Sequence, residues 1–209
     1  MRENGISLYA LESIRPLACF DLIGFSLPYE TLYTNALNIL DLSGIPLRSA
    51  DRDETHPIII AGGHSTMNPE PMHAFIDAFV IGEGEEVIHD IINAIQNVKG
   101  QKSKVNSDLR PSTFDREHLL HELAKIQGVY VPNFYETTYL EDGTIARIEP
   151  TIKDIPAIIT KRMVAKLPPP PTKYIVPNID IVHNRISVEI MRGCTRGCRF
   201  CHAGMITRP

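Results

Sequence analysis

The sequence predicts an α/β protein, and three of its features support this fold class. Short apolar runs rich in branched residues alternate with longer segments whose apolar residues recur at helical spacing. Glycine-rich turns follow two of the apolar runs, at residues 62–63 and 82–84. This order of strand, turn and helix is typical of a parallel sheet covered by helices. We therefore expect a Rossmann-like parallel sheet, followed by a small β-rich linker.

The expected strands and helices alternate through the first part of the chain. Strands are expected at residues 21–27, 57–61 and 78–81, and helices at residues 29–42, 69–76, 85–98 and 115–126. The second strand, PIIIA, is almost purely β-branched, which suits a parallel strand covered on both faces. A weaker strand signal lies at residues 6–8. Because open doubly wound sheets usually have about five strands or more, we expect this sheet to be incomplete at its N-terminal side.

The pattern changes after residue 128. Apolar and polar residues alternate over residues 129–131, 135–140 and 145–148, and Asp142-Gly143 is a hairpin turn signal between the last two. Four consecutive prolines at residues 168–171 predict an extended, semi-rigid linker. Residues 185–191 have the pattern of a further strand. The expected domains are an α/β domain over 1–128, a hairpin and linker over 129–184, and the start of another domain over 185–209.

Composition narrows the function classes. The 209 residues carry a net charge of −4, so charge alone does not indicate nucleic-acid binding. No apolar run approaches the roughly 20 residues that span a bilayer, and the N-terminus lacks a signal-peptide pattern. We expect a cytoplasmic protein. Clustered thiols in a reducing compartment are typical of metal ligands rather than of disulfides.

Three of the four cysteines lie close together near the end of the sequence. Cys194, Cys198 and Cys201 have the spacing C-x3-C-x2-C. Soft thiolates suit iron–sulfur clusters or zinc. A [4Fe–4S] cluster normally takes four cysteines, so three leave one iron open to bind another molecule. Gly193 and Gly197 would let the backbone curl around the cluster, through positive φ angles.

Two other interpretations of the cysteines remain open. Zinc could take the three thiolates with His202 as a fourth ligand, although structural zinc motifs usually pair two close ligands with two distant ones. A redox dithiol could form from Cys198 and Cys201, although such a pair has no need of Cys194.

The segment MRGCTRGCRFCHAG resembles the radical S-adenosylmethionine (SAM) motif, with Phe200 as its aromatic residue. The resemblance implies a [4Fe–4S] cluster held by Cys194, Cys198 and Cys201, with SAM bound to the open iron near Phe200. An electron from a reductant protein would then cleave SAM to methionine and a deoxyadenosyl radical, which attacks an unknown substrate. It also implies a partial (β/α)6 TIM barrel whose first strand is residues 185–191. Since the rest of that barrel is missing, we expect this chain alone to be inactive.

The α/β part resembles the cobalamin (B12)-binding-like domain found before radical SAM barrels in uncharacterised proteins. The stretches DLIGFSLPYE, IIIAGGHST, NPEP and DAFVIGEGE carry the resemblance. It implies a cobalamin-like cofactor site at the carboxyl ends of the strands, formed by Gly62, Gly63, His64, Gly82 and Gly84. No D-x-H-x-x-G stretch is present, and the glycines could simply make tight turns. The alternative functions are therefore a cofactor-binding module without activity of its own and a zinc-stabilised interaction protein.

Overall fold

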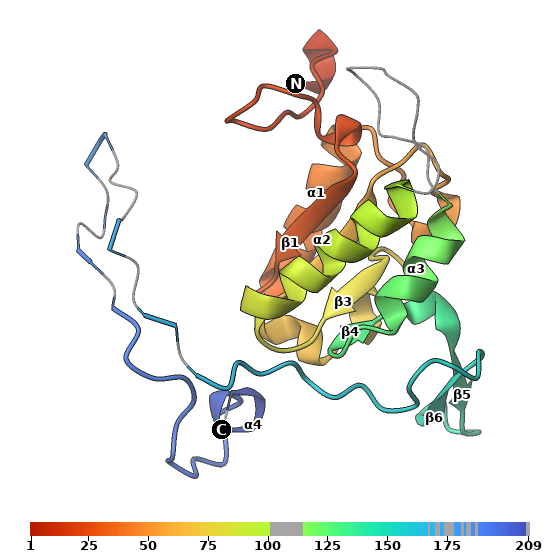
Figure 1. The fold of residues 1–209 in the computed structure, drawn as a ribbon, viewed down its shortest axis with the longest axis vertical. Coiled ribbons are helices and arrows are strands. Elements are labelled where there is room, and N and C mark those ends of the chain that lie inside the picture. The colour runs from red at the N-terminus through yellow and green to blue at the C-terminus, as the bar shows by residue number, and fades with distance from the viewer. Residues whose placement is uncertain are drawn as a thin grey trace. The chain divides into compact units, whose positions relative to one another are not determined.

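The computed structural model describes residues 1–100, 115–166, 168–169, 172–173, 178–180, 182, 185–186 and 188–207. The chain divides into two compact units, Met1–Met163 and Val164–Pro209. The first unit is built on a four-stranded sheet in the order β1-β2-β3-β4 (Figure 1). Its strands are β1 Leu22–Ser26, β2 Ile58–Gly62, β3 Ala78–Val80 and β4 Val129–Tyr130. The first three are parallel and β4 is antiparallel to β3, which confirms the predicted α/β class.

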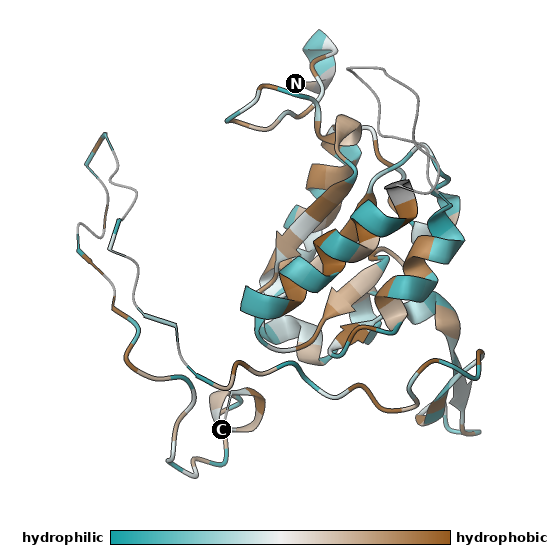
Figure 2. Cartoon of the chain, in the orientation of Figure 1, coloured by the Kyte–Doolittle hydropathy of each residue, from teal (hydrophilic) through white to brown (hydrophobic). Residues whose placement is uncertain are grey.

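Helices cover both faces of this sheet (Figure 1). They are α1 Tyr33–Leu42, α2 Gly84–Gly100 and α3 Arg116–Ala124. Ile58 and Ile60 of β2 lie in the core formed with α2 and α3, whereas Ile59 and Ala61 lie in the core formed with α1. Successive strand residues point to opposite faces, so an unbroken apolar run is what a strand buried on both sides requires. Hydrophilic and hydrophobic bands accordingly alternate along α2 (Figure 2).

The fourth strand does not come from the residues expected to supply it. Residues 6–8 form no strand, and nearby only an isolated bridge joins Tyr9 to Pro16. The fourth strand is instead β4, which pairs Phe79 with Tyr130 at the other edge of the sheet. Residues 129–130 are predicted to belong to the linker, because the sequence of these two residues does not indicate which strand they pair with.

The predicted helix at residues 69–76 is wrong. The structure has a single 3-10 turn there, Glu70–Met72. Pro69 and Pro71 explain the difference, because proline lacks an N–H donor and disfavours helical geometry in the residue before it. The first helix also begins later than expected, because a 3-10 turn, Glu30–Leu32, precedes α1.

The predicted hairpin is confirmed as β5 Tyr135–Tyr139 and β6 Ile145–Pro150, an antiparallel pair. Its turn is set by the Asp142 carboxylate, which accepts hydrogen bonds from the Thr144 backbone N–H at 2.9 Å and hydroxyl at 2.6 Å. Beyond the hairpin, Ile155 is buried in the core beneath α3. The first compact unit therefore continues past the hairpin to Met163.

The second unit contains one short helix, α4 Ala203–Ile206, within its described residues. The strand predicted at residues 185–191 is not formed by those that the structure describes. Ile186, Val188 and Ile190 are 70%, 57% and 83% exposed, so no strand among the described residues covers their side chains. Of the proline run, Pro168 and Pro169 are described and residues 170–171 lie outside the described residues. None of the helices that the structure describes is long and apolar enough to cross a membrane.

Candidate functional site

The cysteine loop lies between residues 185–191 and α4. All three of its cysteines are free thiols, with Cys194 and Cys201 half-buried and Cys198 exposed. The Arg196 backbone N–H donates to the Cys194 sulfur at 3.4 Å. Gly193 has a φ of 80°, as expected of a loop that curls, whereas Gly197 is outside the positive-φ region, so that expectation is wrong.

The three thiols have the right chemistry for an iron–sulfur cluster but are not gathered around one point. Within the described residues, no group of three histidine, cysteine or acidic side chains is placed to hold a metal. The three cysteines and His202, the proposed zinc ligands, are therefore not placed to hold a metal either. Three thiolates repel one another, and metal binding is what normally draws such ligands together. The donor set therefore fits a cluster by its chemistry. Phe200, expected near SAM, is 89% exposed.

The glycine turn after β2 lies against the end of β1. Gly63 and His64 are exposed, and Gly62 is half-buried. Gly63 has a φ of 110°, and a Cβ there would come within 2.6 Å of the Leu27 carbonyl oxygen. The Ser65 backbone N–H also donates to this oxygen, at 3.0 Å. Gly63 is thus required by a close backbone approach, while the surface beside His64 stays open.

The glycine turn after β3 receives another part of the chain. Arg162 donates its backbone N–H to Ile81 at 2.9 Å, and its carbonyl accepts from the Glu83 N–H at 2.9 Å. Gly82 has a φ of 114°, and a Cβ there would overlap the Arg162 backbone. The space beside Gly82 that a cofactor would need is therefore filled by the chain itself. Gly84 is different, because a Cβ at this position would meet no atom within 4 Å.

Arg162 also binds the first turns of α2 through its side chain. One guanidinium nitrogen lies 3.1 Å from a Glu86 carboxylate oxygen and 3.3 Å from one of Asp90. Acidic residues are favourable at the N-terminal, positive end of a helix dipole. Glu86 therefore interacts favourably with both the dipole of α2 and the Arg162 guanidinium. Sequence reasoning missed Arg162, because nothing local to it indicates pairing with a turn so far away in the chain. The available signal in the sequence was the pair of glycines at positions 82 and 128, which in the structure have positive φ and approach Arg162.

Comparison with known proteins places the chain in a family. The family described as radical SAM proteins, N-terminal, matches residues 1–132, which is more than half of the chain. The chain belongs to this family. An uncharacterised protein of Methanocaldococcus jannaschii is 28% identical over 214 aligned residues, which cover 100% of this chain and 36% of that relative. The chain thus spans about a third of its relative's length. No solved structure matches it.

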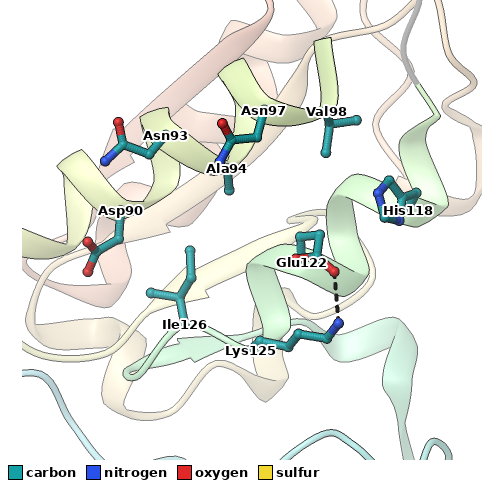
Figure 3. Close-up of a pocket in the computed structure, with 9 residues that line it drawn as sticks. All are labelled: Asp90, Asn93, Ala94, Asn97, Val98, His118, Glu122, Lys125 and Ile126. Carbon is teal, nitrogen blue, oxygen red and sulfur yellow. Dashed lines mark hydrogen bonds and ion pairs between the residues drawn. The ribbon is translucent and has the colours of Figure 1, made fainter. Parts of the chain in front are cut away.

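The radical SAM N-terminal domain also has a groove of about 560 Å³ on its helical side (Figure 3). It lies between α2 and α3, with Ala94, Val98 and Ile126 among polar residues. At one side of it, the Lys125 ammonium donates to the Glu122 carboxylate at 2.8 Å. None of the residues expected to bind a cofactor lines this groove.

The NPEP stretch of the radical SAM N-terminal domain supplies a partner for a buried tyrosine. The Tyr130 hydroxyl donates to the Glu70 carboxylate at 2.8 Å. Burial, with the hydrogen bond and charge of Glu70, raises the pKa of Tyr130. Tyr135 lies beside it, with ring centroids 4.8 Å apart. The stretch thus ties the turn before β3 to β4.

This tyrosine predicts how stability depends on alkaline pH. An unfolded tyrosine has a pKa of about 10, and the folded value is higher, so the protonated phenol stabilises the fold below pH ~10. That contribution is lost as pH rises from ~10 through the raised pKa. We expect the free energy of unfolding of the wild type to fall more steeply between pH ~9 and ~11 than that of Tyr130→Phe. Denaturant titrations of both proteins at pH ~9 and ~11 test this. An equal fall in the free energy of unfolding for the wild type and Tyr130→Phe would contradict it.

Proposed function

We propose that this chain is part of a radical SAM enzyme in which Cys194, Cys198 and Cys201 hold a [4Fe–4S] cluster. Two observations support the proposal. The family match covers residues 1–132, and the three free thiols follow at the spacing of a cluster loop. The chain covers 36% of its relative, so the proposed activity belongs to a longer protein. Clustered free thiols also favour the cytoplasm, where they stay reduced.

Each thiolate of the loop would bind one iron, and the remaining iron would take SAM. When bound, the cluster supplies the electron that cleaves SAM to methionine and a deoxyadenosyl radical. The chain's own contribution is to hold and tune the ligands. Gly193, with its positive φ, turns the backbone into Cys194, and the Arg196 N–H already donates to the Cys194 sulfur. Hydrogen bonds of this kind stabilise the added negative charge of a reduced cluster.

The proposal predicts which thiols the cluster needs. After anaerobic treatment with iron and sulfide, we expect the wild-type chain to show broad absorbance near ~400 nm. Cys198→Ala should lose most of it, because two ligands are too few to retain the cluster. Cys19→Ala is the matched control, since Cys19 lies far from the loop in sequence, and it should keep the absorbance. Equal spectra for the two variants would refute the assignment.

A second candidate function rests on the open surface of the turn after β2. Gly63 and His64 are exposed at the carboxyl end of a parallel strand, which is where α/β sheets bind ligands. A cofactor-binding module, with cobalamin as the first ligand to test, would use this turn rather than the filled space beside Gly82. A cobalamin titration followed by absorbance tests it. Binding weakened in His64→Ala would support this function, and no binding by the wild type would exclude it.

A further inference from the structure

The cysteine loop contains an arginine whose positive charge is not paired with an acidic side chain among the described residues. Arg199 lies in sequence between Cys198 and Cys201, and its side chain is exposed. Among the residues that the structure describes, it has no ion pair or hydrogen bond to its guanidinium. Arg192, just before the loop, differs. Its guanidinium binds the Glu189 carboxylate through two contacts, at 2.6 and 3.1 Å, so that pair is neutral.

Positive charge is concentrated in this part of the sequence. Residues 185–209 contain five arginines and one glutamate, a net charge of +4, whereas the whole chain carries −4. Residues 1–184 therefore carry −8. The charge next to the cysteines is thus opposite in sign to that of the rest of the chain. A negatively charged cluster held by the three thiolates would lie within this region of positive charge.

We infer that Arg199 raises the reduction potential of the cluster bound by Cys194, Cys198 and Cys201; this rests on the proposed function. A cluster with three thiolates is negatively charged, and reduction adds one electron from a one-electron reductant without breaking a bond. Arginine stays protonated in proteins, so its charge attracts the reduced state more strongly than the oxidised one. Arg199 acts on the potential through the charge of the cluster.

The size of the effect follows from Coulomb's law. For an assumed separation of roughly 7 Å, a unit charge changes the ratio of reduced to oxidised cluster by about three- to fiftyfold, between the limits of bulk water and a protein surface. Because Arg199 is exposed, we expect about a tenfold change, which for one electron is about 59 mV.

The test is a redox titration of the reconstituted 209-residue chain, followed by the electron paramagnetic resonance signal of the reduced cluster. We expect a lower potential in Arg199→Gln and a wild-type potential in Arg199→Lys, which keeps the charge. The double variant Glu189→Gln/Arg192→Gln removes a neutral pair and should leave the potential unchanged. These variants share one fold and one ligand set, so a merely structural role of Arg199 would not separate them by charge.

Four results would contradict the inference, three of them for the inference alone. An unchanged potential in Arg199→Gln would overturn it, as would equal falls in Arg199→Gln and Arg199→Lys. A fall in the double variant as large as that in Arg199→Gln would show that any change in the loop lowers the potential. A wild-type chain that takes up no cluster would overturn the proposed function itself, and the inference with it.

Discussion

Replacing Asp77 by alanine is expected to lower the free energy of unfolding by about 3–5 kcal/mol, since breaking a buried ion pair leaves uncompensated charge. The Asp77 side chain is fully buried and lies 3.1 Å from an Arg52 nitrogen and 2.6 Å from an Arg116 nitrogen. It also accepts hydrogen bonds from the Ile59 N–H and the Ser49 hydroxyl. Within the described chain, the two arginine nitrogens have no other partner.

Without Asp77, the Arg52 guanidinium cannot easily reorient toward solvent. Arg52 is held by the carbonyls of Pro46, Leu47 and Phe75, at 2.6–2.9 Å. Burial already lowers the pKa of Arg52, and the nearby Asp77 carboxylate opposes that shift. Removing the carboxylate therefore leaves a buried positive charge beside that of Arg116.

Denaturant unfolding measures this prediction. Asp77→Asn keeps the size and one hydrogen-bond acceptor, so it should lose less than Asp77→Ala and remain folded enough to measure. Glu54→Ala removes an exposed carboxylate nearby in the sequence and should change the free energy of unfolding by no more than about 0.5 kcal/mol. A loss below about 1 kcal/mol in Asp77→Ala would show that the arginines find other partners.

The second large effect is expected at Gly82. Its φ of 114° costs a non-glycine residue about 1–3 kcal/mol, and the added Cβ would overlap the Arg162 backbone. We expect Gly82→Ala to lose about 3 kcal/mol or more and to release Arg162 from the end of β3. The Glu83 amide, which donates to the Arg162 carbonyl, should then exchange its hydrogen faster.

Gly84→Ala is the matched control for this prediction. Gly84 begins α2, has no positive φ, and has no atom within 4 Å of where a Cβ would stand. Alanine there should be neutral or stabilise the fold by up to about 1 kcal/mol, because it restricts the unfolded chain. Thermal unfolding and hydrogen exchange of Gly82→Ala and Gly84→Ala test this prediction. Similar effects at both positions would mean that Arg162 does not depend on Gly82.

The core of the fold could be predicted from the sequence because its signals are local. The apolar run of β2 specifies a strand buried on both faces, and Asp142-Gly143 specifies the hairpin turn. The strand β4 could not be found in this way. Its two residues are placed by pairing with β3, a contact between distant parts of the chain that no local pattern records.

The candidate site likewise has features that local sequence signals predict and features that they do not. The spacing of the cysteines identifies the donor atoms, but the spacing does not say how they are arranged, and within the described residues they are not gathered into a metal-binding group. At Gly82 the sequence predicts a close contact but not the identity of the contacting group. A glycine after a strand indicates a close approach, but the sequence does not say whether a ligand or the backbone of Arg162 makes it.

The metal content of the chain tests the central claim most directly. The chain would be loaded anaerobically with iron and sulfide in the presence of equimolar zinc, desalted, and analysed for iron, sulfide and zinc. A radical SAM loop predicts about four irons and four sulfides per chain, lost together in Cys198→Ala. About one tightly bound zinc per chain, with no sulfide and with dependence on His202, would contradict it and favour a zinc-stabilised protein.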